Sequence, residues 1–402
     1  MRVSSGDAVA EPTELNAMPA IRAGALPRIG MIEGLAEAEP VWRRLEAEGR
    51  ATAYQRFDWC AARLAALPAP HAVRVAVIGH PGTPLALLPL AVEKRFGVRH
   101  GRMLGSELGN ADSLIVSAEG LERLTPETVR ALMPAIGKAA GLDTLMLHNI
   151  APEREGWREP LAALDRMPSA SRLYRSHIGS TALPFIDNGL TSKLRANIRR
   201  GMRRIEETSG PVKLVRVTEP ALFSRVHREF NAQRDARFAQ MGLDNPFATP
   251  DMCALFEELA RRGLGGKNPF FLVHALMAGD EILATSFGLR SGSHFSQYIN
   301  STSLGPASKY SLMGILIGLM LDELLEDGIV SFDMGVGDFA YKTDWTEPVE
   351  VYDALVPVTA RGELVLQFEG AALFAKRVIK RTPALWSFAQ RLRRGVYGLR
   401  HP

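Results

Sequence analysis

The chain has 402 residues, 46% of them hydrophobic and 23% charged, which is ordinary for a globular protein and enough for two domains. Its net charge of +4 argues against a uniformly basic nucleic-acid-binding surface. Two isolated cysteines, Cys60 and Cys253, lack the spacing of a zinc site or a redox pair, so we expect a reducing compartment and no metal site.

Neither the N-terminal segment nor the longest apolar run predicts a signal peptide or a membrane span. Residues 1–27 begin with "MRVSSGDAVAEPTEL", which is small and polar and has no signal-peptide core, so we expect them to be disordered. The longest apolar run, residues 311–321, is too short to span a bilayer and is followed by Asp322 and Glu323. These features predict a cytoplasmic protein.

The first half contains a hairpin followed by a helix and a strand. Residues 73–79 and 84–92 are two apolar runs joined by "HPGT", which predicts two strands and a turn. Residues 124–150 then read as a capped helix, a glycine and a strand.

The second half repeats this order. Residues 270–277 and 281–289 are joined by "AGD", and residues 310–335 read again as helix, glycine and strand. Strands interleaved with helices and hairpins indicate two mixed α/β halves rather than a doubly wound parallel fold. We place an N-terminal domain at residues 28–187 and a C-terminal catalytic domain at 188–370.

A basic helix is predicted at the junction, over residues 191–210. Six cations cover most of its circumference: Lys193, Arg195, Arg199, Arg200, Arg203 and Arg204. Such a helix suits a phosphate-rich ligand, such as a coenzyme ribose phosphate, a lipid pyrophosphate or RNA, but it could also bridge two domains.

An alternating strand is predicted over residues 293–303, with His294, Ser296, Tyr298 and Asn300 on one face. It leads through a small, polar loop containing Lys309 into the apolar helix. The free N–H groups of the first helical turn there favour an anion such as phosphate. The alternative is that Ser308 or Ser311 caps the helix and Lys309 is solvated.

The stretch "FDMGVGDFAYKTDW", residues 332–345, gathers polar and aromatic side chains where a strand ends. It resembles the closing motif of the CelD-type acyltransferases, a branch of the GNAT superfamily also called BioF2-like or type 6 acetyltransferases. The matching residues are Phe332, Asp333, Gly337, Asp338, Tyr341, Lys342 and Trp345.

Further motifs extend the resemblance to residues 40–366. They are "VHREFNAQR", "MAGDEILATSFGL" and "KYSLMG" in the second half, and "WRRL", "YQRFDW", "PLALLPL" and "GSELGNADSLIV" in the first. One position departs from the family pattern: Leu312 and Met313 replace the Pro-Gly after Tyr-Ser, and Gly314 follows one place later.

The resemblance implies a tandem GNAT-like fold in which two parallel strands, residues 295–301 and 330–334, splay apart around the thioester of coenzyme A. Acyl transfer to an amine needs a base, an oxyanion donor and an acid. Tyr341 is the candidate acid and Asp338 or Asp333 the candidate base, with Lys342 also in the catalytic group. The expected mechanism is direct transfer, because no Cys-His or Ser-His pairing is evident.

The expected donor, acetyl-CoA or another acyl-CoA, is a co-substrate and not a permanently bound cofactor. Its candidate contacts are Tyr298, Asn300, Lys309, Ser311, Met313 and Gly314. Candidate acceptor contacts are His227, Arg234, Arg237 and Trp345. Each has a structural alternative: His227 and Trp345 could be core residues, and the two arginines could be a solvated helix face.

The tail, residues 371–402, is basic and amphipathic. From Gly370 onward the chain has eight Lys/Arg and no Asp or Glu, so subtracting them from +4 leaves −4 for the first 369 residues. The tail could lie on an anionic inner membrane surface or dock on the protein's own acidic body.

These features predict a cytoplasmic N-acyltransferase that moves an acyl group, expected to be acetyl, to an amino group. The resemblance to the CelD type implies that this amino group belongs to a sugar or lipid-linked sugar in exopolysaccharide or envelope synthesis. One alternative is a FemXAB-like ligase that uses aminoacyl-tRNA, the only reading with a nucleic-acid partner. Another is a non-catalytic GNAT-like partner of a polysaccharide synthase, for which the altered "YSLMG" loop is the hint.

Overall fold

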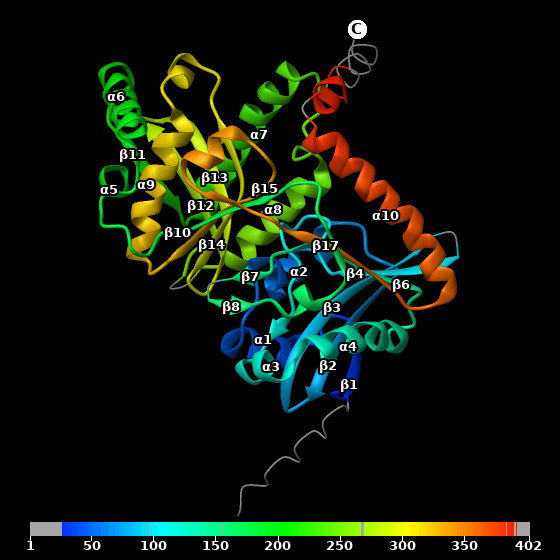
Figure 1. The fold of residues 1–402 in the computed structure, drawn as a ribbon. Coiled ribbons are helices and arrows are strands. Elements are labelled where there is room, and N and C mark those ends of the chain that lie inside the picture. Colours follow the sequence, from blue (N-terminus) through cyan, green and yellow to red (C-terminus); the bar gives the residue numbers. More distant parts are fainter. Residues whose placement is uncertain are drawn as a thin grey trace, which may run out of the picture.

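The computed structural model describes residues 26–95, 97–154, 156–266, 269–382, 384–389 and 391. The predicted disordered segment, residues 1–27, lies almost wholly outside this range, as does the end of the predicted tail. The described chain forms two mixed sheets with helices between and around them (Figure 1).

The first sheet follows the order β1-β2-β3-β4-β6-β17-β9, and β5 pairs with β3. Its strands are β1 (Ile29–Glu33), β2 (Ala72–His80), β3 (Thr83–Arg95), β4 (Val98–Met103), β5 (Ile115–Val116), β6 (Thr144–Ile150), β9 (Arg166–Pro168) and β17 (Tyr352–Pro357). Its helices are α1 (Glu39–Glu48), η1 (Ala53–Gln55), α2 (Phe57–Ala66), α3 (Ala118–Arg123), α4 (Pro126–Ala139) and η2 (Pro160–Ala163).

The second sheet follows the order β11-β12-β13-β14-β15-β10-β16. Its strands are β10 (Leu173–His177), β11 (Val212–Val217), β12 (Phe271–Ala278), β13 (Glu281–Ser291), β14 (His294–Thr302), β15 (Ser331–Val336) and β16 (Glu347–Val349). Its helices are α5 (Phe185–Asn188), α6 (Ser192–Ser209), α7 (Pro220–Gln240), α8 (Pro250–Gly263), η3 (Pro306–Lys309), α9 (Leu312–Glu326) and η4 (Ala340–Asp344). A small hairpin of β7 (Glu153–Arg154) and β8 (Trp157–Arg158) and the long α10 (Ala360–Arg381) complete the fold.

The two sheets exchange strands. β10 precedes residue 188 in the chain but lies in the second sheet, whereas β17 follows the whole second unit and pairs with β6 and β9 of the first. A sequence boundary at residue 188 therefore does not divide the two sheets. The sequence does not reveal this exchange of strands, because each exchanged strand is short and has an ordinary strand composition.

Three hydrophobic clusters set the layers. One lies between the first sheet and α4, and another between the second sheet and α9 with α5 and α6. The third is shared: it joins Trp42, Trp59 and Val77 of the first unit to Phe230 and Phe287 of the second. Both faces of each sheet are thus buried, which explains why their strands read as continuous apolar runs.

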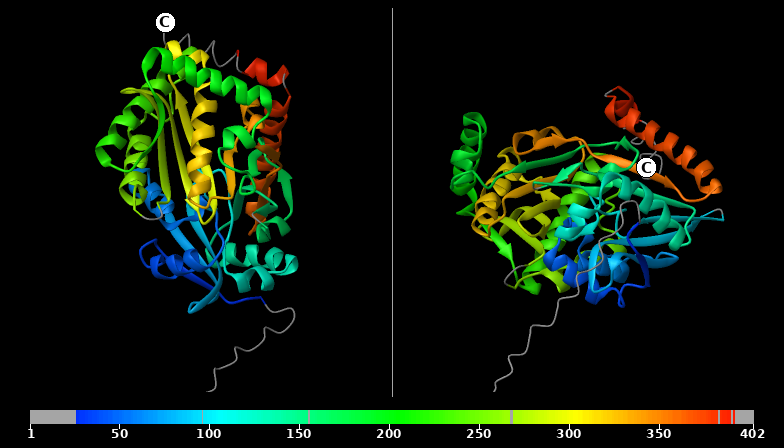
Figure 2. Two further views of the ribbon diagram at one scale, coloured as in Figure 1. Left: turned by 90° about the vertical axis from the view of Figure 1, so that its left-hand side faces the viewer. Right: turned by 60° about the horizontal axis from the view of Figure 1, so that its bottom comes forward.

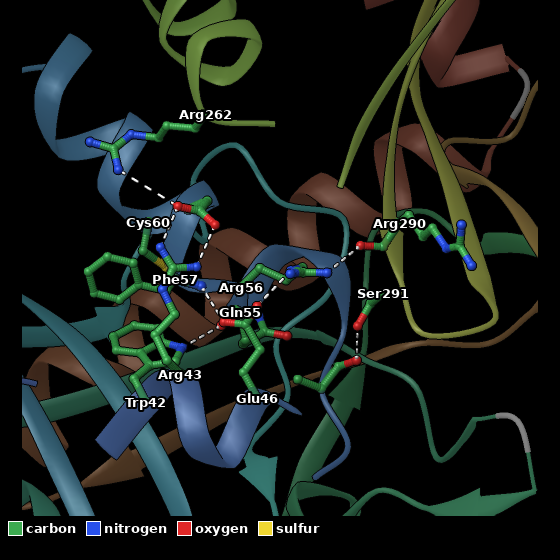
Figure 3. A network of polar contacts seen from close by, with 12 residues as sticks. Trp42, Arg43, Glu46, Gln55, Arg56, Phe57, Cys60, Arg262, Arg290 and Ser291 are labelled. Atoms are coloured by element: carbon green, nitrogen blue, oxygen red, sulfur yellow. Dashed lines mark hydrogen bonds and ion pairs between the residues drawn. The ribbon is translucent and has the colours of Figure 1, made fainter. Parts of the chain in front are cut away.

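Polar contacts also close the junction between the units (Figure 3). Asp58 on α2 accepts hydrogen bonds from Arg43 on α1, and Arg262 on α8 approaches it to 3.8 Å. Arg56 forms an ion pair with Glu46 at 2.8 Å and also donates to the Arg290 carbonyl oxygen at 3.3 Å. The shared core and these contacts make the two units one packed body.

The two predicted basic segments lie at opposite ends of the molecule, with α6 on one side and α10 on the other (Figure 2). α10 docks on the first unit through buried Gly362 and Leu366, and Arg361 pairs with Asp143 at 3.0 Å. These contacts precede the predicted tail; within it, Arg381 pairs with Glu350 at 2.8 Å and donates to the Ser169 carbonyl oxygen at 3.0 Å, so the start of the tail lies against the protein's own body. None of the described helices has the length and apolar character needed to cross a membrane.

Candidate active site

The central feature of the second sheet is a parallel pair of strands that separates. β14 and β15 pair at only three positions, from His294 opposite Ser331 to Ser296 opposite Asp333. Beyond them β14 runs on to Thr302, while β15 continues beside β10 on its other edge. This is the divergence that the resemblance implies, and it opens the sheet between residues 297–302 and 334–336.

A β-bulge lies in β14 at the point of separation. Ile299 is opposite Phe287, but Gln297 is opposite Gly288, so Tyr298 is an extra residue. A bulge shifts the alternation by one, and the predicted common face therefore ends at Tyr298. Asn300 leaves the face that carries His294 and Ser296, a change that no alternating pattern could predict.

Three predicted site residues meet at this gap. The Asn300 side-chain amide donates to the Tyr341 hydroxyl at 3.5 Å, joining β14 to η4, which follows β15. Arg234 of α7 donates from Nη1 to the Asn300 carbonyl oxygen at 3.1 Å. Burial raises the pKa of Tyr341, while Asn300 and Arg234 oppose that rise, so the phenol is protonated at neutral pH. Tyr341 thus has the position and protonation state of an acid.

Asp333 is buried and fully engaged by donors. It accepts hydrogen bonds from His294 Nε2, Ser296 Oγ and the Gly335 backbone N–H, each at 2.7 Å. Burial acts to raise its pKa, but the contacts with His294, Ser296 and Gly335 outweigh it and lower the pKa below its usual value. Its carboxylate has no free side toward an incoming amine, so the predicted role as base is not supported; its contacts hold the end of β15.

The network around Asp333 continues into the first unit. Ser296 Oγ contacts the Tyr54 hydroxyl at 2.8 Å, and Asn110 donates to that hydroxyl at 2.6 Å. The Asn110 side-chain oxygen accepts from the Val336 N–H at 3.4 Å. The sequence did not predict Tyr54 or Asn110 as site residues. The signal that could have pointed to them is their place in the family-like motifs "YQRFDW" and "GSELGNADSLIV".

Lys342 is buried beneath the closing motif. Its Nζ donates to the carbonyl oxygens of Gly335 at 3.1 Å and Val336 at 3.2 Å. Burial lowers its pKa to about 8, although Asp333 and Asp338 act in the opposite direction. The two hydrogen bonds from the ammonium fix Gly335 and Val336 at the end of β15, where Gly335 has a left-handed φ of 68°.

Asp338 lies on the β10 side of β15 and not at the gap. Its Oδ1 accepts from Arg172 Nε at 2.7 Å and from the Tyr174 hydroxyl at 3.0 Å. Both contacts are made by Oδ1 and tie the loop after β15 to the start of β10, which gives Asp338 a structural role there. The predicted assignment of Asp338 as base is therefore not supported either.

Two predicted acceptor contacts are core residues. His227 is buried among aromatic rings, with Phe256 at 5.4 Å and Phe223 at 5.5 Å between centroids, and burial lowers its pKa to about 4. Trp345 is 8% exposed and stacks on Phe185 beneath α9. In both cases the structural alternative describes the side chain.

Two other candidates also lie away from the gap. Tyr298 packs edge-on against Trp59, with ring centroids 5.3 Å apart, in the core shared by the two units. Arg237 is exposed near the end of α7. Tyr298 therefore links the units rather than lining a coenzyme site.

The start of α9 has an open first turn. Ser311 occupies the N-cap with a left-handed φ of 52°, and no side chain caps the helix, so the capping alternative is wrong. Met313 and Gly314 are half-buried in this turn, and Lys309 is exposed in η3 just before it. The uncapped N–H groups leave the predicted anion site available.

The basic helix α6 packs beside this turn. Its buried side consists of Ile198, Gly201 and Ile205, and a Cβ added at Gly201 would lie 2.6 Å from the Tyr310 carbonyl oxygen. Arg199 pairs with the Asp187 carboxylate, and Arg203 and Arg204 pair with Glu207. Arg195 donates to the Asp187 backbone carbonyl oxygen, and no carboxylate partner is found for Lys193, Arg195 or Arg200 among the described residues.

Comparison with protein families gives a match for most of the second unit. Residues 192–343 match the family model described as an acetyltransferase (GNAT) domain. These residues span α6 to η4 and include the divergent strands, α9 and Tyr341. The predicted enzyme class, a GNAT-type N-acyltransferase, is confirmed at the level of this domain, and GNAT domains use acetyl-CoA as co-substrate. This match does not show whether the domain belongs to the CelD-type branch.

Solved structures resemble this fold over 82–85% of the chain at low sequence identity. The C-terminal domain of a putative lysylphosphatidylglycerol synthetase from Agrobacterium fabrum has a TM-score of 0.50 at 14% identity, covering 83% of this chain and 96% of its own. A conserved protein of unknown function from Bacteroides thetaiotaomicron gives 0.52 at 11% identity, covering 82% and 100%. L-PGS from Bacillus licheniformis gives 0.50 at 12%, covering 85% and 96%. The predicted fold class, tandem GNAT-like units with mixed sheets, is confirmed. A search among curated protein sequences gives no match.

Proposed function

We propose that the chain transfers an acyl group, in the first instance acetyl, directly from coenzyme A to an amino group bound at the gap between β14 and β15. The observation that carries this proposal is the separation of the two strands after three residue pairs, with Tyr341 and Asn300 meeting across the opening. The match of residues 192–343 to an acetyltransferase domain supports the same reaction.

The chemistry follows from the groups at the gap. The amine nitrogen attacks the thioester carbonyl carbon, a C–N bond forms, and the C–S bond breaks. The leaving thiolate takes the proton of the Tyr341 hydroxyl, which Asn300 orients. Because Asp333 and Asp338 are held by other partners, the proton of the attacking amine passes to water in this scheme.

The donor phosphates are assigned to the first turn of α9. Its N–H groups have no side-chain cap, and the positive end of the helix dipole favours an anion. Lys309 precedes the turn, and Lys193 and Arg200 on the neighbouring α6, which have no carboxylate partner among the described residues, add positive charge. The thioester would then reach the gap from the face of the sheet that α9 covers.

Calorimetric titration with acetyl-CoA tests the donor site. A Cβ at Gly314 would lie 3.4 Å from Ile198, an ordinary contact, so Gly314→Ala is the matched control. We expect Gly314→Val, which presses on Ile198, to weaken binding about tenfold, and Lys309→Ala to weaken it about threefold. Failure of the wild-type protein to bind acetyl-CoA or longer acyl-CoAs would refute acyl transfer.

The acceptor we propose is an amino sugar or lipid-linked amino sugar of exopolysaccharide or envelope synthesis, worked on at the inner membrane face. Its support, beyond the resemblance of the closing motif, is an exposed apolar stripe on α10. Phe368 is 77% exposed, Leu364 60% and Ile379 40%, and they share the side of the helix opposite buried Leu366. Lys376 is exposed beside the stripe, whereas Lys380 donates from Nζ to Ser171 Oγ at 3.3 Å.

A helix with one side on the protein and an apolar stripe flanked by cations fits an anionic lipid surface. Flotation with phosphatidylcholine vesicles, with and without phosphatidylglycerol, tests this contact. Binding should require the anionic lipid, fall about fivefold for Lys376→Gln, and be lost for Phe368→Ser. Lys138→Gln on α4 is the matched control. Self-association through the stripe, seen by sedimentation and relieved by Phe368→Ser, would instead assign it to a second copy.

The exposed cations of α6 favour one alternative, a FemXAB-like ligase that takes an amino acid from aminoacyl-tRNA. Salt-sensitive binding of aminoacyl-tRNA without binding of acetyl-CoA would select it. If neither donor binds, the remaining reading is a non-catalytic GNAT-like partner of a polysaccharide synthase.

A further inference from the structure

Arg234 is a half-buried cation beside the proposed transfer site. It projects from α7, and its guanidinium lies 4.8 Å from the ring centroid of Phe247 and 4.9 Å from that of Phe238. Its Nη1 donates to the Asn300 carbonyl oxygen. The side chain is therefore held by aromatic rings on one side and by the bulged strand on the other.

The Arg234 guanidinium has no carboxylate counter-ion in the described part of the chain. Among the residues that the structure describes, no carboxylate lies within ion-pair distance of Arg234, and its Nε is buried without a hydrogen-bond partner. Arg216, by comparison, pairs with Glu323 and Asp327. Burial lowers the pKa of Arg234 to about 10, so the group is still charged at neutral pH. A partly desolvated, unpaired cation gains most from an anion that binds beside it.

We propose that Arg234 binds an anionic group, a carboxylate or a phosphate, of a substrate that occupies the gap. This inference rests on the proposed function and specifies the acceptor: an amine that carries a negative charge near the reacting nitrogen. α7 packs against the core shared by the two units, whereas α9 covers the opposite face of the second sheet. The anion at Arg234 is thus on the face opposite the proposed donor phosphates, which assigns it to the acceptor.

The test uses inorganic phosphate and acetate as probes on the full chain, with saturating coenzyme A present to occupy the donor site. Phosphate or acetate should raise the melting temperature of the wild-type protein, and Arg234→Gln should weaken that binding about tenfold or more. Arg234→Lys should retain part of it. Arg237→Gln, three residues along the same helix and exposed, is the matched control and should bind the anions like the wild type.

The outcomes separate the possible sources of the anion. Equal stabilisation of wild type and Arg234→Gln by the probes, or of neither, would overturn the proposal. A tenfold loss of acetyl-CoA affinity in Arg234→Gln would assign the anion to the donor and refute the acceptor assignment. Failure of the wild-type protein to bind acetyl-CoA at all is a separate result, which removes the proposed function but leaves the anion titration to decide on Arg234 itself.

Discussion

Lys342 offers a quantitative test of the closing motif. Its ammonium is buried, and its pKa of about 8 in the folded protein contrasts with the ordinary value of 10.5. Below pH 8 both the folded and the unfolded chain hold this proton. Between about pH 8 and 10.5 the unfolded chain holds more protons than the folded one, so stability should rise with pH across that window.

The size of the effect follows from the difference between the two pKa values. Each pH unit corresponds to about 1.4 kcal/mol, so the contribution of Lys342 changes by roughly 3 kcal/mol between pH 8 and 10.5. Other groups titrate in this range as well, and the informative quantity is therefore the difference between the wild type and Lys342→Met. That difference should change in favour of the wild type as the pH rises.

Urea unfolding at several pH values from 7 to about 10.5 measures the difference. Lys138→Met, which removes an exposed lysine on α4, is the control and should show no comparable trend. Titration of carbon-13-labelled lysine by NMR would give the pKa directly. A Lys342 resonance that titrates near 10.5, or a wild-type minus variant difference that is constant with pH, would refute the reasoning.

The other predictions concern the two carboxylates and the contacts between units. Asp333→Asn should lower the free energy of unfolding by about 3 kcal/mol at neutral pH, and this contribution should be lost on acidification below about pH 4. Asp338→Asn should lower it by less than about 1 kcal/mol. Similar values for the two variants would contradict the different burial of the two carboxylates. Tyr54→Phe should cost about 1–3 kcal/mol in urea unfolding, and a change under about 0.5 would show that its buried hydroxyl contacts are replaceable. Gly201→Val places a Cβ against the Tyr310 carbonyl oxygen and should displace α6, weakening acetyl-CoA binding in calorimetry; unchanged affinity would remove α6 from the donor site.

Much of the site was visible in the sequence. The predicted strands and helices of both halves correspond to β2, β3, α4 and β6 and to β12, β13, α9 and β15, because long apolar runs bounded by glycine and turn residues specify such elements locally. The closing motif brought Asp333, Tyr341 and Lys342 to the end of β15, as expected of a short segment after a strand.

The roles within that motif depended on contacts from distant parts of the chain. Asp333 and Asp338 look alike in sequence, yet one is enclosed by His294 and Ser296 and the other pairs with Arg172. Similarly, the sequence left open whether His227 lines a pocket, and the structure shows it enclosed by rings of α7, α8 and β13.

The sequence by itself determined the local elements, the two-fold repetition of their order and the composition of the closing motif, since hydrophobic period and turn residues act over a few positions. Only the tertiary structure decided the exchange of β10 and β17, the bulge at Tyr298 and the environment of Arg234, which has no carboxylate partner among the described residues. Strand pairing, register and charge partners are set by residues far apart in the chain, and no local pattern records which of them meet.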